Sequence, residues 1–106
     1  MKKLGNELHC ITHSDPGHGW LGVKIDMVKL SGAEISPFSS HRGKTAYLEE
    51  DGDAPAFIKA IESKGFKVFI EERYTDRNSP IRSYAPFAQK GFLKDHFVVV
   101  HIGGDQ

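Results

Sequence analysis

A chain of 106 residues with 39% hydrophobic content is expected to form one domain around a single core. Its 14 basic and 14 acidic side chains give a formal net charge of zero, so only a local patch, and not a global field, would attract nucleic acid. One cysteine excludes an internal disulfide and a multi-cysteine zinc site. The sequence contains no apolar run of signal-peptide or membrane-span length, and we expect a cytoplasmic protein without membrane association.

The first expected element is a short strand over Glu7–His13, whose side chains alternate between two faces that each mix apolar and polar residues. The stretch HSDPGHGW, residues 13–20, follows as a turn in which Trp20 anchors the next helix. A helix is predicted over Lys24–Leu30, with Gly32 as its stop signal. The apolar residues with helical spacing are Val23, Met27 and Leu30.

Two runs rich in Ser, Thr and aromatic residues come next, Ile35–Ser40 and Thr45–Glu49. They predict a hairpin in which Gly43 takes the positive φ angle. The clearest helix signal of the chain begins at Asp53, the expected N-cap residue, and ends at Gly65. The sequence therefore predicts a hairpin followed directly by a helix.

The last third of the chain predicts two strands separated by a turn-rich segment. FKVFIEE, residues 66–72, alternates as a half-buried strand does. TDRNSPIRSYAPF, residues 75–87, has two prolines and several turn formers, which indicate an ordered loop or an edge segment. HFVVVHI, residues 96–102, is a β-branched run that predicts a terminal strand.

This order of elements predicts an α+β fold, a mainly antiparallel sheet of about five strands with two short helices packed on one face. We predict a single domain over residues 1–106, with a main module at about 8–87 and a C-terminal strand extension at 88–106. That extension either belongs to the sheet or pairs with a second copy of the chain, which would give a homodimer.

The HSDPGHGW stretch concentrates side chains that bind metals or exchange protons near neutral pH, namely His13, Asp15 and His18. Its glycines leave backbone N–H groups free to meet an anion. Two histidines at this spacing are not a recognised ligand pattern, so further metal ligands would have to come from elsewhere, such as His9, His41 or the acidic run Glu49–Asp51, of which Glu50 and Asp51 are preferred. The interpretations, in order of preference, are a structural turn, a partner-binding loop, and a metal or catalytic site.

The sequence lacks the motifs of common small enzymes. It has no Gly-x-Ser-x-Gly elbow, phosphate-binding loop or dinucleotide fingerprint, and no pair of His-x-Ser/Thr tripeptides of the kind that two-histidine phosphoesterases use. Cys10 lies in a predicted strand without an acid–base partner at a fixed distance. We therefore predict no catalytic residue and no cofactor.

Arginines and tyrosines are interleaved between residues 73 and 84 and form the best candidate recognition strip. The alternative interpretation is a solvated loop whose arginines pair with neighbouring acidic side chains. We combine the strip with the loop at residues 13–20 and with the predicted hairpin turn. The predicted partner-binding residues are His13, Asp15, His18, Trp20, Arg42, Arg73, Tyr74, Arg77, Arg82 and Tyr84.

Four stretches stand out by their order and spacing: HSDPGHGWL, ISPFSS, YLEEDGDA and SPIRSY. Together they resemble a family of short uncharacterised proteins of proteobacterial phages, plasmids and integrated elements. The resemblance spans about Thr12–Phe87. Because that family has no assigned reaction, the resemblance implies a mobile-element setting and not a mechanism.

A small, neutral domain from a mobile element, without a catalytic motif, is expected to act by occupying a surface. The first hypothesis is a non-catalytic binding protein with a protein partner, such as an anti-CRISPR-like antagonist of a host defence system. The alternative is a small metal-dependent hydrolase or nucleotide-binding enzyme that uses His13, Asp15 and His18, with metal ligands drawn from His13, His18, Glu50 and Asp51. A nucleic-acid partner is a third, less favoured hypothesis.

Overall fold

The computed structural model describes residues 6–87 of the chain. In chain order the elements are β1 (Glu7–Ser14), β2 (Gly19–Lys24), α1 (Ile25–Ser31), β3 (Ser40–Arg42), β4 (Thr45–Glu49), α2 (Asp53–Ser63), β5 (Lys67–Tyr74), the 3₁₀ helix η1 (Pro80–Ser83) and β6 (Ala85–Pro86). The predicted strand at residues 96–102, and with it the proposed homodimer contact, lies outside the described residues.

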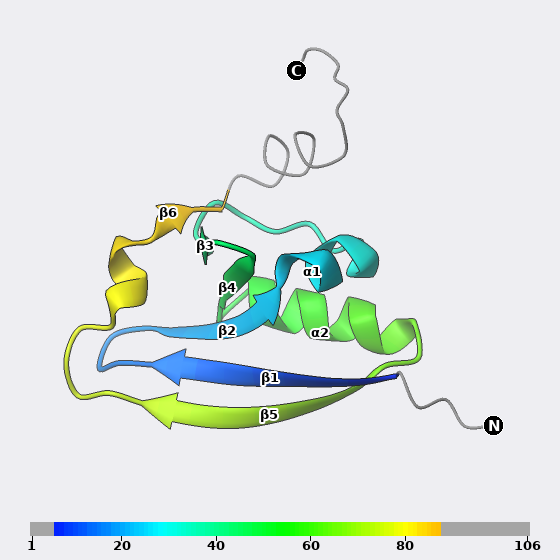
Figure 1. The fold of residues 1–106 in the computed structure, drawn as a ribbon, viewed down its shortest axis with the longest axis horizontal. Coiled ribbons are helices and arrows are strands. Elements are labelled where there is room, and N and C mark those ends of the chain that lie inside the picture. Colours follow the sequence, from blue (N-terminus) through cyan, green and yellow to red (C-terminus); the bar gives the residue numbers. More distant parts are fainter. Residues whose placement is uncertain (1–5, 88–106) are drawn as a thin grey trace, which may run out of the picture.

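All six described strands form one sheet in the order β5-β1-β2-β4-β3-β6 (Figure 1). β1 and β5 are parallel, and every other neighbouring pair of described strands is antiparallel. The predicted α+β fold is therefore confirmed, with six strands in the sheet and two helices packed against it.

Both helices pack on the same face of the sheet and share one hydrophobic core with it. Strand residues alternate between the two faces, and the side chains on the helix side of β1, β2 and β4 supply the sheet's part of this core, with Cys10 as the one fully buried residue of β1. Each fully buried aliphatic or aromatic side chain contributes roughly 1.5–3 kcal/mol to the free energy of unfolding. The core residues of these three strands and the two helices include Cys10, Leu21, Val23, Ile25, Val28, Ala46, Leu48, Phe57 and Ile61.

The region between residues 13 and 32 differs from the prediction in one respect. The helix is present as α1, and its C-cap Gly32 has a φ of 74°, as the stop signal predicts. The turn at HSDPGHGW does not lead into it directly. Residues 19–24 form β2, which pairs antiparallel with β1 and places Trp20 opposite His13. Val23 therefore belongs to a strand, although it shares the helical spacing of Met27.

Asp53 is not the N-cap of α2, which is Gly52. The carboxylate of Asp53 instead accepts hydrogen bonds from the Ser36 hydroxyl at 2.7 Å and from the Ser39 hydroxyl. Ser39 also accepts a bond of 2.8 Å from the backbone N–H of Glu49. These bonds hold residues 35–39 as a loop, so the first strand of the predicted hairpin is confined to β3.

The other predicted elements within residues 6–87 are present, but the strand predicted as half-buried, β5, is exposed at every residue except the partly buried Val68. Gly43 and Gly65 have φ angles of 59° and 94°, at the hairpin turn and just after α2. The run at residues 66–72 lies in β5 apart from Phe66, at one edge of the sheet, and the turn-rich segment supplies η1 and β6 at the other edge. No helix within residues 6–87 is long and apolar enough to cross a membrane.

Candidate binding face

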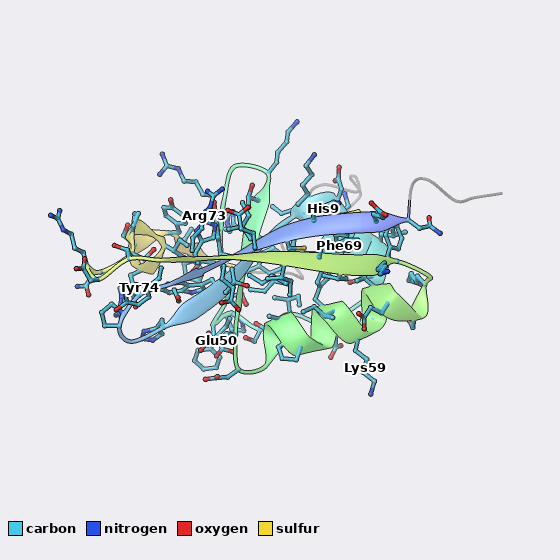
Figure 2. All side chains as sticks on the ribbon, turned by 90° about the horizontal axis from the view of Figure 1, so that it is seen from below. His9, Glu50, Lys59, Phe69, Arg73 and Tyr74 are labelled. Atoms are coloured by element: carbon cyan, nitrogen blue, oxygen red, sulfur yellow. The ribbon has the colours of Figure 1, made fainter. Side chains whose placement is uncertain are left out.

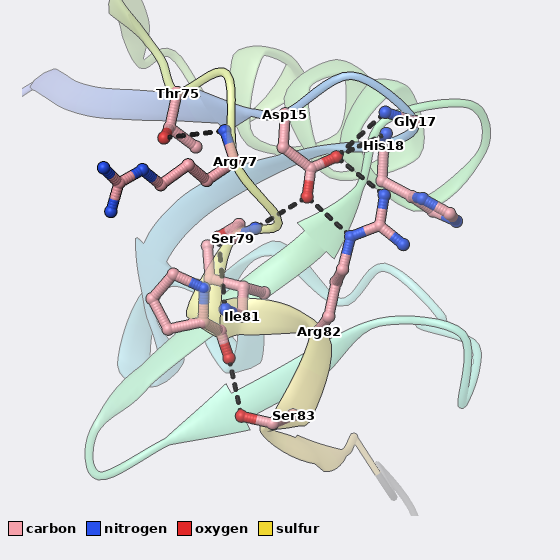
Figure 3. A network of polar contacts seen from close by, with 10 residues as sticks. Asp15, Gly17, His18, Thr75, Arg77, Ser79, Ile81, Arg82 and Ser83 are labelled. Atoms are coloured by element: carbon pink, nitrogen blue, oxygen red, sulfur yellow. Dashed lines mark hydrogen bonds and ion pairs between the residues drawn. The ribbon is translucent and has the colours of Figure 1, made fainter.

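The HSDPGHGW stretch forms a tight turn between β1 and β2, built on the side chain of Asp15 (Figure 3). Its Oδ1 accepts hydrogen bonds from the backbone N–H groups of Gly17 at 3.0 Å and His18 at 2.9 Å. The backbone N–H of Asp15 donates to the carbonyl of His18 at 2.9 Å. An aspartate that bonds the backbone two and three residues ahead stabilises a turn. The structural interpretation of this stretch therefore has direct support.

Three hydrogen bonds from the segment before β6 complete the surroundings of Asp15. Arg82 contacts both carboxylate oxygens, with Nε 2.6 Å from Oδ2 and Nη2 2.9 Å from Oδ1. The backbone N–H of Ser79 donates to Oδ2 at 2.8 Å. We call Asp15, Ser79 and Arg82 the Asp15 clamp. It ties the first loop of the chain to the last described turn, as Figure 3 shows.

The clamp keeps Asp15 ionised. The Arg82 guanidinium holds the pKa of this carboxyl well below its usual range. Burial acts in the opposite direction, and the backbone N–H groups of Ser79, Gly17 and His18 lower the pKa further. A buried carboxylate that already accepts five hydrogen bonds has little capacity left for a metal or a proton.

Gly17 makes room for the clamp. A Cβ atom at this position would lie 2.7 Å from Nη2 of Arg82, closer than such atoms approach in proteins. The close approach of Arg82 therefore favours glycine at position 17, in addition to the role of this residue in the turn.

The four residues of the predicted metal set do not come together. His18 stacks on Trp20 with 5.7 Å between ring centroids, and with Glu50 and Asp51 it borders a cavity of about 360 Å³. His13 borders different cavities. Within residues 6–87, no group of three or more His, Cys, Asp or Glu side chains is arranged to hold a metal ion.

The best candidate binding surface is the side of the sheet away from both helices, which we call the open face. It is assembled from residues in cross-strand register. In Figure 2, His9 and Arg73 lie on this side, whereas Lys59 projects from α2 in the opposite direction. The main open-face residues of β5, β1, β2, β4 and β3 are Phe69, Glu71, Arg73, His9, Ile11, His13, Gly22, Lys24, Thr45, Tyr47, Ser40 and Arg42.

Aromatic rings meet at the centre of the open face. The ring centroids of His13 and Tyr47 are 5.8 Å apart in an edge-on arrangement, and those of Tyr47 and Tyr84 are 5.3 Å apart. Gly22 lies beneath the first pair. A Cβ atom there would be 3.5 Å from both Nε2 of His13 and Cε1 of Tyr47. Glycine thus leaves the backbone bare under the two rings.

Two cavities adjoin this ring pair, and both are bordered by His13 and Tyr47. One, of about 290 Å³, extends toward Arg73 and Tyr84. The other, of about 300 Å³, extends toward Lys24. Each is at the lower limit of the volumes found for small-molecule sites, so each suits one small group. We call these two cavities, which share His13 and Tyr47, the groove.

Cationic side chains border the groove while its floor is neutral. Burial, and to a lesser extent the charge of Arg73, lower the pKa of His13 below its usual value. Burial, followed by the neighbouring Tyr84, raises the pKa of Tyr47, and Arg42 opposes this rise. At neutral pH the ring pair is therefore uncharged. The cations of the open face are Lys24, Arg42, Lys67 and Arg73, and its carboxylates are Glu7, Glu49 and Glu71.

Several of these charges already contact neighbours on the same face. Arg73 pairs with Glu71 at 2.9 Å between Nε and Oε2. Arg42 lies over the ring of Tyr84, with 5.3 Å from Cζ to the centroid. Lys67 lies 5.5 Å from the ring centroid of Phe69. Both cations are thus held close to aromatic faces, where a planar ligand would meet them.

The structure divides the ten predicted partner-binding residues into groups. His13, Arg42, Arg73 and Tyr84 belong to or border the open face, and Tyr74 borders one of its cavities. Two more, Asp15 and Arg82, form the clamp. The ring of His18 stacks on the buried Trp20, and Arg77 is exposed in the loop after β5.

Sequence reasoning missed Tyr47, Lys24 and Gly22. The alternation of TAYLE assigns Tyr47 to the face opposite Ala46 and Leu48, and this signal was available in the sequence. Nothing in the sequence alone brings Lys24 and Gly22 beside it, because β2 was not predicted.

Cys10 points to the core side of β1, and its side chain is buried. Burial raises the pKa of its thiol to about 11. A thiol with this pKa is almost entirely protonated at neutral pH and is a poor nucleophile.

Comparison of the chain with protein-family models, with curated proteins and with solved structures finds no match. The resemblance to mobile-element proteins therefore stays a prediction, and function has to be argued from the open face itself.

Proposed function

We propose that this chain is a non-catalytic binding protein whose open face contacts its partner. The observation that carries the proposal is the pair of cavities adjoining the His13–Tyr47 ring pair, with cations along their border. Aromatic side chains and arginine are enriched at the centres of interfaces, where they contribute most of the binding energy.

The state of the reactive groups favours binding over catalysis. Asp15 is committed to the clamp, and Cys10 is a buried thiol with a raised pKa. His13, the first residue of the alternative hydrolase site, borders different cavities from His18. The hydrolase hypothesis therefore has less support than the binding hypothesis.

The resemblance to mobile-element proteins extends this proposal to antagonism of a host defence system. In that setting the open face would cover a surface that the partner needs. This extension depends on the resemblance alone and is secondary to the binding proposal.

A capture experiment with three tagged proteins tests the binding proposal. They are the wild type, the open-face variant Tyr47→Leu/Arg73→Ala, and Lys59→Ala as a control on the opposite side of the sheet (Figure 2). Nuclease-treated and untreated bacterial lysates are compared by quantitative mass spectrometry. We expect a partner, protein or nucleic acid, that wild type and control retain equally and that the open-face variant loses by about tenfold.

The same captured material in equal amounts for all three proteins would contradict the proposal. Circular dichroism of each variant checks that a loss of capture does not reflect unfolding. If the open-face variant does not fold, Lys24→Ala replaces it, since this exposed residue makes no side-chain cap hydrogen bond at the start of α1.

A further inference from the structure

The groove on the open face has two adjoining subsites. Its two cavities share His13 and Tyr47, and each has the volume for one small group. A ligand that fills both must carry two such groups on a short connection that passes the ring pair. Because the shared lining is aromatic, flat groups that stack on rings fit best.

The charges around the subsites indicate an anionic connection between those flat groups. Lys24 and Arg42 both lie in register with Thr45, so two cations flank one end of the groove. Arg73 borders the cavity at the other end. The open face carries four cations against three carboxylates, an excess of one positive charge in a chain whose net charge is zero.

We infer that the open face binds single-stranded nucleic acid, an inference that rests on the proposed binding function. A base occupies each cavity beside the His13–Tyr47 ring pair, and the phosphates that connect the bases lie near Lys24, Arg42 and Arg73. Repeated flat groups on an anionic backbone are the defining chemistry of this polymer.

A single strand fits this surface better than a duplex does. Stacking on His13, Tyr47 and Tyr84 requires bases whose faces are free, and paired bases in a duplex have their faces covered by their neighbours. The rings of His13 and Tyr47 stand on the inner strands β1 and β4, so they meet a ligand that lies along the sheet surface.

The small charge excess limits the strength of the electrostatic contribution. Three phosphate contacts would give a slope of about −2 for the logarithm of the association constant against the logarithm of salt concentration. Affinity would then fall roughly 15-fold between 50 and 200 mM salt. Stacking supplies the part of the affinity that salt does not change.

Fluorescence anisotropy with labelled oligonucleotides tests this inference. The probes are single-stranded 12-mers of oligo-dT and oligo-U and a 12-base-pair duplex, each at several salt concentrations. We expect micromolar binding of the single strands at 50 mM salt and at least about tenfold weaker binding of the duplex.

Matched variants separate stacking from charge. Tyr47→Leu should weaken single-strand binding by about tenfold, whereas Phe38→Leu, at an exposed aromatic outside both cavities, should change it by less than about twofold. Lys24→Ala should reduce the salt slope by about 0.7, and Lys59→Ala on the opposite side of the sheet should leave it unchanged.

The inference is overturned if the full chain shows no single-strand binding at 50 mM salt, if the duplex binds equally well, or if the control variants lose as much as the groove variants. If oligonucleotides fail but nuclease-treated lysate still yields a partner that depends on the open face, only this inference falls. If both experiments fail, the proposed function falls with it.

Discussion

Asp15 and His13 are two residues apart in the sequence and have opposite environments. The carboxylate of Asp15 is buried and accepts five hydrogen bonds, while the ring of His13 borders two cavities on the open face. A concentration of reactive residue types in one stretch therefore does not identify a functional site. What each side chain contacts in the folded chain decides between structure and function.

The polar stretches that stand out in the sequence are joined in pairs. HSDPGHGW meets SPIRSY through the Asp15 clamp, and ISPFSS meets YLEEDGDA through the hydrogen bonds of Ser36 and Ser39 to Asp53. Packing thus explains much of their composition. The open face, in contrast, is assembled from alternate residues of five strands.

Asp15→Asn should have the largest effect, because it removes the charge of the clamp while keeping the shape of the side chain. Every partner of this carboxylate is a donor, so the NH₂ group of asparagine would face another donor. We expect the melting temperature at pH 7 to fall by on the order of 10 °C. Asp26→Asn is the control, since that side chain is 89% exposed.

Acidification should reduce the difference in melting temperature between wild type and Asp15→Asn. The folded-state pKa of Asp15 is lowered, so its stabilising contribution is present above the unfolded-state pKa near 4 and is lost as the pH falls below it. A melting temperature that Asp15→Asn leaves unchanged at pH 7 would mean that the clamp does not stabilise the fold.

Ser39→Ala tests whether the hydrogen bonds of Ser39 stabilise the fold as the Asp15 clamp does. The Ser39 side chain is fully buried and bonds both Asp53 and the backbone N–H of Glu49. Leaving these partners unsatisfied should lower the free energy of unfolding by about 1–3 kcal/mol, measured by urea denaturation. Ser63→Ala removes an exposed hydroxyl and should cost less than about 0.5 kcal/mol. Equal costs would contradict the assignment of Ser39 to a structural centre.

Gly17→Ala should have a smaller effect, because the guanidinium end of Arg82 has some freedom to move away from the added methyl group. We expect the melting temperature to fall by about 5 °C. In an Arg82→Ala background, Gly17→Ala should cause little further loss, and a full additional loss would exclude the steric explanation.

The titration of His13 should show the smallest effect. We expect an NMR midpoint below 6.5, and a partial return toward that value in Arg73→Ala, because burial is the larger cause of the shift. Since folding disfavours the charged ring, this residue reduces stability as the pH falls through the unfolded-state pKa near 6.5. A midpoint at or above 6.5 would contradict the partial burial of His13 beside Arg73.

Local patterns in the sequence were sufficient for most of the fold. The alternation of residues 66–72 predicts β5, and glycines with positive φ mark the hairpin and the end of α2. β2 was missed because the helical spacing of Val23, Met27 and Leu30 suggested a helix, while GWLGVK lacks a clear alternation. The Asp53 N-cap prediction was wrong because two serines more than ten residues away compete for the same carboxylate.

The candidate site was less predictable than the fold. His13, Arg42, Arg73 and Tyr84 were proposed as contacts from residue type alone, and the sheet brings them to one face. Asp15 was grouped with these contacts on residue type. Its partner Arg82 is 67 residues away, and no local pattern in the sequence connects the two. The sequence shows which side chains are charged or reactive. Which residues pair with them depends on the topology of the fold.

The Asp15 clamp also constrains the order in which the chain folds. Its two side chains close a loop of 67 residues, and closing a long loop costs entropy before the contact is gained. β1, β2 and β4 can pair earlier through shorter separations. We therefore expect the clamp to form late, and a chain that ends before Arg82 would have to bury the carboxylate of Asp15 without its cation.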